Sequence, residues 1–281
     1  RMAQIRPNLL KIDLHLMKKS AYHSGYLGVM RSFSTLAEQI GASLLVEGVE
    51  SRQDLKRAVQ IGARYVQGYL FAPAEPDFRA ADAFAGLIKT ELDEQKKHLQ
   101  ATLAYWQGLG RELAAAVRAS GIRDALRDVR MPDHDEGNPD DDEGAELADR
   151  AIRRLLPHLD ARCMRVYLCR DSGIQVSANH YRDAAEGWST DLSYRRADWS
   201  WRPYFIPHLS RDNRSDHEAK VSNTYTDLDT HAWIRTVSIP INEYGLLFMD
   251  VIDQPDESPR VRGISEYNGG SPSSPMEPFG L

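Results

Sequence analysis

The chain has 281 residues, of which 27% are charged, and its formal net charge at neutral pH is −6. No apolar run approaches the ~20 residues that a membrane-spanning helix needs, and the first residues carry charges and a proline where a signal peptide is apolar. The mild, dispersed acidity gives no footprint for a nucleic acid polymer or an anionic membrane. These features predict roughly two domains that engage neither kind of partner.

The N-terminal part opens with a β-rich run at Leu9–Leu14, behind a proline. Residues with helical periodicity follow as far as Ile40, and Gly41 is typical of a helix C-cap. Residues 42–46 are continuously apolar, as in a strand that is buried on both faces. The order so far is strand, helix, strand.

A second helix is predicted from Arg52 to Ile61. Ser51 is an N-cap candidate, and Asp54 lies three positions further on, as in a capping box. Tyr65–Gln67 is the third predicted strand. Strands alternating with helices at this spacing predict a parallel sheet or barrel.

A long helix is expected from Asp77 to about Ala119, with apolar residues near every 3.6 positions. Little else in this part of the sequence can cover that stripe, so we expect a homodimer. Residues 132–144 are acidic and poor in apolar side chains. A Ca²⁺ loop needs acceptors at positions 1, 3 and 5 and glycine at position 6; counted from Asp133, those last two positions hold Gly137 and Asn138. A solvated connector is therefore predicted, within a helical linker at 81–144.

The C-terminal part has a different order of predicted elements. One helix is predicted at 145–156, followed by short strands at 162–169, 175–178, 231–241 and 244–250. This order predicts an antiparallel sheet preceded by a helix. The stretch Gly269–Pro275 is small and polar, and residues 257–281 are expected to form a disordered tail.

The two cysteines, Cys163 and Cys169, lie six positions apart within one predicted strand. On an extended strand they share a face but lie roughly 20 Å apart, which is too far for a disulfide. The spacing is not that of a CxxC metal or redox site. We expect two ordinary thiols in a reducing compartment, and hence a cytoplasmic location.

Three motifs in the N-terminal part carry a specific resemblance. They are LKID at Leu10–Asp13, VEGVE at Val46–Glu50 and VQGYLF at Val66–Phe71. In this order and at these separations they resemble strand ends of EAL domains. That family is a TIM-like barrel that uses two divalent metals to hydrolyse cyclic di-GMP to linear pGpG. The resemblance covers about residues 1–80 and implies the C-terminal part of such a barrel.

The resemblance also implies roles for individual residues. Lys11 would orient or activate the attacking water, Glu47 would belong to the Mg or Mn cluster, and Gln67 would hold the water or the substrate. Asp13 and Glu50 are weaker candidates. Active sites of barrels lie at the C-terminal ends of strands, where the three main candidates fall.

The family's remaining motifs precede LKID, so we expect this chain to be part of a longer protein and to be inactive alone, since three strands cannot close a barrel. One hypothesis is a cyclic-di-GMP phosphodiesterase that the C-terminal domain regulates. The alternative is a degenerate EAL domain that binds cyclic di-GMP without hydrolysing it. A scaffold that binds no nucleotide is a third hypothesis.

The C-terminal part, at about 145–256, resembles the PAS-like sensors called Cache domains. The resemblance rests on WRPYF at 201–205, SNTYTD at 222–227, TVSIPI at 236–241 and GLLFMD at 245–250. It implies that Arg202, Tyr204 and Asp227 bind a small ligand, with the arginine fork facing a carboxylate and the aspartate an amine. The usual Trp-Tyr pair reads Pro203-Tyr204 here.

A purely structural, dimerising role for this domain is the alternative. In that case Arg202 is part of an ion pair, and the nearby aromatic residues form an ordinary core: Trp199, Trp201, Phe205 and Trp233.

Overall fold

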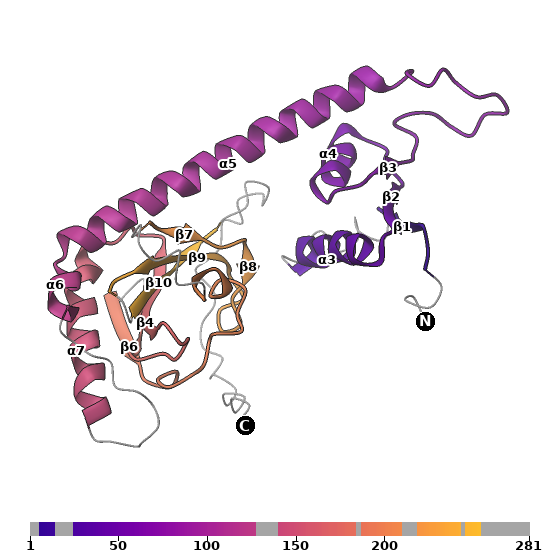
Figure 1. Cartoon of the computed structure of the whole chain (residues 1–281). Coiled ribbons are helices and arrows are strands. Elements are labelled where there is room, and N and C mark those ends of the chain that lie inside the picture. The colour runs from indigo at the N-terminus through magenta and orange to yellow at the C-terminus, as the bar shows by residue number, and fades with distance from the viewer. Residues whose placement is uncertain are drawn as a thin grey trace. The chain divides into compact units, whose positions relative to one another are not determined.

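The computed structural model describes residues 6–14, 25–127, 140–183, 187–209, 218–242 and 245–253. The chain divides into two compact units, Arg1–Ala104 and Tyr105–Leu281 (Figure 1). Among the described helices, none has both the length and the apolar character needed to cross a membrane. The predicted tail at 257–281 lies outside the described residues, as does most of the acidic connector.

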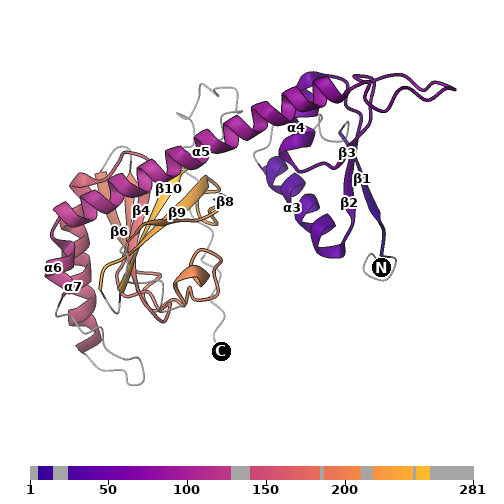
Figure 2. The ribbon, with the colours of Figure 1, turned by 45° about the horizontal axis from the view of Figure 1, so that its top comes forward.

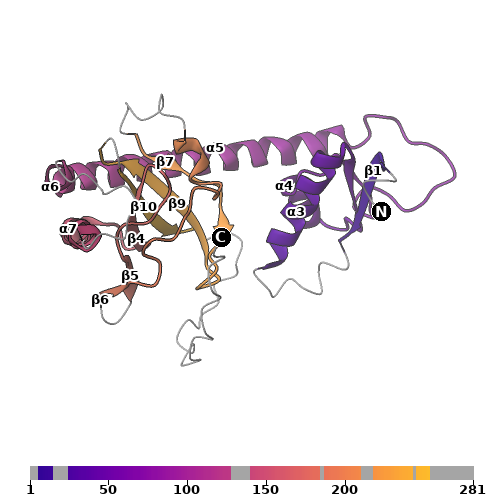
Figure 3. The same ribbon diagram turned by 60° about the horizontal axis from the view of Figure 1, so that its bottom comes forward.

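The N-terminal unit contains a three-stranded parallel sheet with the order β1-β2-β3. Its strands are β1 (Leu9–Asp13), β2 (Ser43–Glu47) and β3 (Tyr65–Val66). Helices α3 (Gly25–Ile40) and α4 (Arg52–Gln60) connect them and lie on the same face of the sheet (Figures 2 and 3). The predicted order of strands and helices is confirmed.

Burial in β2 differs from the prediction. Leu44 and Val46 are almost fully buried, whereas Leu45 between them is half-buried. Among the described residues, α3 and α4 cover only one face of the sheet, so successive side chains alternate between core and surface. A continuous apolar run did not distinguish this arrangement from a strand covered on both faces.

The predicted helix caps are confirmed. Ser51 accepts a hydrogen bond from the Asp54 backbone N–H, and the Asp54 carboxylate accepts in return from the Ser51 N–H, which makes a capping box. Gly41 has φ = 72°, the left-handed conformation that glycine adopts without steric strain at a helix C-terminus.

Helix α5 spans Ala85–Ala119 and begins eight residues later than predicted. The preceding residues form turns in which Ala83 N–H donates to Ala80 O and Ala85 N–H donates to Asp82 O. Phe84 packs edge-on against Phe71, with ring centroids 5.2 Å apart. This contact is between residues distant in sequence, which explains why helical periodicity alone placed the start too early.

The C-terminal unit contains a seven-stranded sheet with the order β6-β5-β4-β10-β9-β7, and β8 also pairs with β9. All its strand pairs are antiparallel, as predicted. The strands are β4 (Cys163–Arg170), β5 (Asn179–Asp183), β6 (Gly187–Asp191), β7 (Lys220–Val221), β8 (Tyr225–Thr226), β9 (Trp233–Pro240) and β10 (Gly245–Ile252).

Four of these strands, β5 to β8, were not predicted. Strands β5 and β6 have the polar sequences NHYRD and GWSTD, and β7 and β8 are two residues long, so none shows a clear apolar alternation. The predicted strand at 175–178 is instead an irregular segment that contacts β4 through an isolated bridge between Cys169 and Gln175 and through hydrogen bonds from the Val176 and Ser177 N–H groups to Leu168 O.

Helices cover one face of this sheet. The segment of α5 from Tyr105 onward, α6 (Ile122–Leu126) and α7 (Asp140–Leu155) pack there around a large apolar core. Helix α7 begins five residues before the predicted start, within the acidic segment that we expected to be a connector. Acidic side chains are favoured in a first helical turn because they face the positive end of the helix dipole.

Side chains of the central strands alternate between this core and a second cluster on the opposite face. The second cluster contains Tyr167, Phe205 and Phe248. The pairing register shifts between Asp250 and Val251, so that Asp250 pairs with Arg165 but Val251 pairs with Cys163. Arg165 therefore belongs to the second face, and the short strand β8 and the 192–209 segment border that face.

The same shift separates the two cysteines. Both are buried and free, so the predicted absence of a disulfide is confirmed. The prediction that they share a face is wrong, since Cys163 packs into the helix-side core and Cys169 into the second cluster. An irregularity in strand pairing reverses the alternation, and strand periodicity alone did not reveal it.

Candidate functional site

The C-terminal edge of the N-terminal sheet brings together the predicted strand-end residues. Lys11 Nζ lies 2.5 Å from Glu47 Oε2, and these side chains are 50% and 32% exposed. Asp13 pairs directly with Glu47 across β1 and β2. Lys11 and Asp13 are two positions apart on β1 and share a face. The lysine therefore offsets the repulsion between two neighbouring carboxylates.

Gln67 follows β3 at the same edge and is fixed by its backbone. Its N–H donates to Val46 O at 2.9 Å, and its carbonyl accepts from Val49 N–H at 3.1 Å. The next residue, Gly68, passes so close to Val49 that an added Cβ would lie 2.1 Å from the Val49 carbonyl oxygen. Only glycine fits there, so the QGYLF and EGVE segments hold each other in place. The Gln67 side chain is exposed.

Glu50 is exposed and contributes its backbone N–H to the α4 cap, where it donates to Asp54 Oδ2 at 3.1 Å. Carboxylate oxygens such as those of Asp13 and Glu47 suit Mg²⁺ or Mn²⁺. Among the residues that the structure describes, however, no group of three or more His, Cys, Asp or Glu side chains could hold a metal ion. The described residues therefore do not form a metal site by themselves.

A second site lies in the C-terminal unit, on the face of the sheet opposite the helices. It is a cavity of about 50 Å³ that includes all three predicted sensor residues, Arg202, Tyr204 and Asp227. Its other lining residues are Arg165, Tyr167, Gln175, Asn179, Tyr194, Trp199, Tyr225, Leu228 and Asp229. The aromatic walls are fixed by stacking, for example of Tyr204 on Tyr225 with ring centroids 5.8 Å apart.

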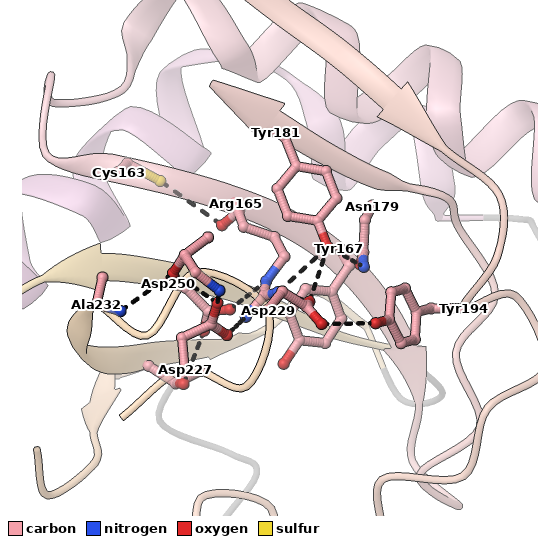
Figure 4. A network of polar contacts seen from close by, with 12 residues as sticks. Cys163, Arg165, Tyr167, Asn179, Tyr181, Tyr194, Asp227, Asp229, Ala232 and Asp250 are labelled. Carbon is pink, nitrogen blue, oxygen red and sulfur yellow. Dashed lines mark hydrogen bonds and ion pairs between the residues drawn. The ribbon is translucent and has the colours of Figure 1, made fainter. Parts of the chain in front are cut away.

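Arg165 organises the polar side of this cavity (Figure 4). Its Nε donates to Asp250 Oδ2 at 2.6 Å, its Nη1 donates to Asp229 Oδ2 at 3.0 Å, and its Nη2 donates to Asp227 Oδ1. One guanidinium thus contacts three carboxylates. The geometry follows from the strand register, which places Asp250 of β10 directly between Arg165 of β4 and Thr236 of β9.

The three carboxylates are held differently. Asp250 is fully buried, and this burial raises its pKa despite the ion pair with Arg165 and a hydrogen bond from Thr236. Burial acts in the same direction on Asp227, but Arg165 and hydrogen bonds from Thr230 outweigh it and lower the pKa. Both oxygens of Asp229 are engaged, one by Arg165 and the other by the Tyr194 hydroxyl at 2.9 Å.

Arg202 differs from Arg165. It lies over the rings of Trp199, Trp201 and Tyr204, with distances of 5.0–5.9 Å from its guanidinium carbon to the ring centroids. Its Nε is buried and has no hydrogen-bond partner among the described residues. Arg202 also forms no ion pair with the described residues, whereas a purely structural role for this domain predicted one. Trp201 is 65% exposed and is not a core residue.

Sequence patterns identified three residues that line this cavity, but they did not identify the ion-pair cluster around Arg165. Arg165, Asp229 and Asp250 were not singled out. Two of them left a visible signal, because Arg165 and Asp250 interrupt the apolar strands CMRVYLCR and GLLFMDVI. Charged side chains are rarely buried unless they are paired, so two charges in central strands indicate an internal ion pair.

An open groove of about 480 Å³ also lies between α7 and β6, lined mainly by Glu146, Asp149, Arg150, Arg153 and Arg195. Its buried anchor is Asp149. This carboxylate accepts from Ala178 N–H at 2.9 Å and Arg195 Nη2 at 2.5 Å, and it lies 3.1 Å from His180 Nε2. Burial favours a higher pKa for Asp149, but these hydrogen bonds outweigh it and lower the pKa.

Comparisons with known proteins match both units. Residues 1–74 match the family model of the EAL domain, and residues 141–254 match that of the EAL-domain-associated signalling protein domain. The chain is 32% identical over 255 residues to an uncharacterized EAL-domain-containing protein, YkuI of Bacillus subtilis. It is 33% identical over 86 residues to the cyclic di-GMP phosphodiesterase RocR of Pseudomonas aeruginosa, covering 31% of this chain and 22% of RocR.

A crystal structure of B. subtilis YkuI in complex with its substrate c-di-GMP and calcium resembles this chain, with a TM-score of 0.70 and 29% identity. That match covers 90% of this chain and 59% of the crystallised one. In the sequence comparison, the aligned region is 89% of this chain and 57% of YkuI. The chain therefore combines a segment that matches the EAL domain, at 1–74, with one that matches the EAL-domain-associated signalling protein domain, at 141–254.

Proposed function

We propose that this chain is part of a cyclic-di-GMP phosphodiesterase whose EAL domain is regulated by the C-terminal unit. The proposal is carried by three residues in the segment that matches the EAL model: Glu47 ends β2, Gln67 follows β3, and Lys11, in the middle of β1, reaches the Glu47 carboxylate with its side chain. The similarity to a protein crystallised with c-di-GMP and to a named phosphodiesterase supports the same substrate.

The residues of this chain suit parts of such a reaction. Mg or Mn ions, when bound by the whole EAL domain, would bind the phosphodiester and lower the pKa of a water. Glu47 offers carboxylate oxygens at the strand edge. Lys11 carries a positive charge beside it that can orient an attacking water or meet the charge that develops on phosphate oxygens. Gln67 has an exposed amide whose backbone is held rigidly.

The alternative is a binding module that holds cyclic di-GMP without cleaving it. One observation supports it: YkuI, whose structure resembles 90% of this chain, was crystallised with c-di-GMP and calcium. Hydrolysis of cyclic di-GMP by the intact protein, with Mg²⁺ or Mn²⁺ present, separates the two functions. Formation of linear pGpG supports the phosphodiesterase. Micromolar binding without turnover contradicts the phosphodiesterase and supports the binding module. If the protein does not bind cyclic di-GMP at all, the result supports a scaffold that binds no nucleotide.

The C-terminal unit is proposed to be a PAS/Cache-like sensor. An antiparallel sheet carries helices on one face and a cavity with polar and apolar walls on the other, and the predicted ligand residues Arg202, Tyr204 and Asp227 all line that cavity. The two buried free thiols are consistent with the proposed cytoplasmic location. Ligand binding here would change hydrolysis through α5, the element that joins the units.

We also propose that α5 mediates a homodimer. Leu92, Leu99 and Leu103 are all more than half exposed and lie on one side of the helix, since their spacings of seven and four positions are close to whole helical turns. Such an exposed stripe is typical of a helix that packs against a second helix.

A further inference from the structure

We propose that the cavity of the C-terminal unit binds a short-chain carboxylate through Arg202 and has no place for the amine of an amino acid. This inference rests on the proposed sensor function and names the chemical class of its ligand. It follows from which of the charged groups around the cavity are already engaged within the protein and which are not.

The acidic groups are engaged. Asp227 contacts Arg165 with one oxygen and accepts two hydrogen bonds from Thr230 with the other. Asp250 accepts a hydrogen bond from Arg165 with one oxygen and a hydrogen bond from Thr236 with the other. Asp229 contacts Arg165 with one oxygen and the Tyr194 hydroxyl with the other. The guanidinium of Arg165 therefore occupies the position among three carboxylates that a ligand ammonium would need.

The amides of the cavity are engaged as well. Gln175 Nε2 donates to Ser177 O and to Asn179 Oδ1, and its own carbonyl oxygen accepts from Trp199 Nε1 at 2.7 Å. Asn179 Nδ2 donates to the Tyr181 hydroxyl. These contacts leave neither side chain with a full set of groups to offer a polar ligand.

Arg202 is the charged group that remains. Its Nε is shielded from solvent without an acceptor, and no described carboxylate pairs with it. The rings of Trp199, Trp201 and Tyr204 lie within 5.0–5.9 Å of the guanidinium carbon and restrict where the guanidinium can move. A buried polar group nearly always has a hydrogen-bond partner, so the Nε, unpaired among the described residues, marks a position for an acceptor that they do not supply. A planar carboxylate matches the guanidinium fork with two parallel hydrogen bonds.

The size of the cavity limits the rest of the ligand. Its volume of about 50 Å³ is far below the ~300–1,000 Å³ of sites that take drug-sized molecules. Trp199, Tyr204 and Leu228 provide apolar walls beside Arg202. A carboxylate with a tail of one to three carbons, such as acetate or propionate, fits this combination of one charge, apolar walls and small volume.

The test compares three compounds of similar size on the intact protein: propionate, alanine and propylamine, each at matched ionic strength. Calorimetric titration and thermal unfolding should show that propionate binds and raises Tm, with alanine and propylamine at least tenfold weaker. Arg202→Gln should weaken propionate binding at least tenfold, and Arg202→Lys should also weaken it because the fork is lost. Arg118→Gln, at an exposed position on α5, is the matched control and should bind like the wild type.

Unliganded Tm and circular dichroism of each variant show whether it is folded, and Arg202→Lys serves if Arg202→Gln does not fold. Alanine or propylamine binding as tightly as propionate overturns the ligand class but leaves a ligand-binding sensor intact. Unchanged propionate binding by both Arg202 variants overturns the assignment of Arg202. If none of the three compounds binds the folded protein, this inference fails, and the proposals of a sensor domain and of an EAL domain are unaffected.

Discussion

Arg165 and Asp250 face each other on adjacent central strands, with Arg165 Nε 2.6 Å from Asp250 Oδ2 and Asp250 completely buried. Asp227 and Asp229 approach the same guanidinium from the segment after β8. The arginine thus links the centre of the sheet to a loop that borders the cavity. A change at this pair should affect both the stability of the C-terminal unit and the shape of its cavity.

Arg165→Gln should destabilise the C-terminal unit by about 3–5 kcal/mol, because removing one partner leaves buried carboxylates uncompensated. The paired carboxylate of Asp227 has a lowered pKa in the folded state, so its stabilising contribution is present above the unfolded pKa and is lost as pH falls through the folded pKa. The difference in unfolding free energy between wild type and variant should therefore shrink in acid. Urea unfolding at pH 7 and near pH 3, which is below the ordinary aspartate pKa of 3.8, measures it. A pH-independent difference would contradict the assignment.

Lys11→Ala or Glu47→Ala in the intact protein should abolish hydrolysis of cyclic di-GMP, with binding at least partly retained. Lys11 pairs with Glu47 at the strand edge, and the proposed roles need both the positive charge and the carboxylate. Product formation by chromatography and binding by calorimetry measure the two effects separately. Lys89→Ala removes a more exposed lysine–carboxylate pair on α5 and should leave the rate unchanged. Rates near wild type for both strand-end variants would show that the assigned roles are wrong.

Gly68→Ala should destabilise the N-terminal unit by about 1–3 kcal/mol, the usual range for forcing extra atoms into a packed site. The new Cβ would lie 2.1 Å from the Val49 carbonyl oxygen, so the backbone of EGVE or QGYLF must move. Gly86→Ala on α5 is a suitable control because its Cβ would meet no atom within 4 Å. Thermal unfolding of both variants tests this, and equal Tm values would contradict the close approach. Because Gln67 adjoins Gly68, hydrolysis should fall as well.

Asp149→Asn should destabilise the C-terminal unit at neutral pH by about 1.5–3 kcal/mol, the usual size of hydrogen bonds to a charged group. The wild-type carboxylate has a lowered pKa, so its contribution is complete above the unfolded pKa and disappears as pH falls through the folded pKa. Denaturant titrations from pH 7 to pH 3 should show that the unfolding free energy of the wild type falls towards that of the variant as the pH decreases. Asp171→Asn, at a half-buried turn position, provides a comparison. If the difference in unfolding free energy between wild type and variant stays constant over this pH range, the charge of the Asp149 carboxylate does not stabilise the unit.

Leu99→Glu combined with Leu103→Glu should convert the intact protein from a dimer to a monomer, because charges would replace the exposed stripe of α5. Gln100→Glu, exposed on another side of the same helix, should leave the dimer intact. Light scattering gives the mass of each protein directly. A wild-type monomer would refute the proposed dimer, and a dimeric double variant would place its interface elsewhere.

The sequence by itself determined the order of strands and helices in the N-terminal unit, the capping box at Ser51, and the antiparallel character of the C-terminal sheet. Those features depend on local rules, namely helical and strand periodicity and the hydrogen bonds of residues three or four positions apart. Motif resemblance placed Lys11, Glu47 and Gln67 at strand ends; in the parallel register Glu47 lies at the edge beside Asp13, and Lys11, two positions earlier on β1, reaches Glu47 with its side chain.

Only the tertiary structure decided the rest, because the deciding contacts join residues far apart in the chain. The register shift beside Asp250 sends Arg165 and Cys163 to opposite faces, which no periodicity within β4 reveals. The late start of α5 accompanies the contact between Phe84 and Phe71. Asp227 was predicted to await a ligand amine, but the fold brings Arg165 to it across 62 positions of sequence and leaves Arg202 as the unpaired charge.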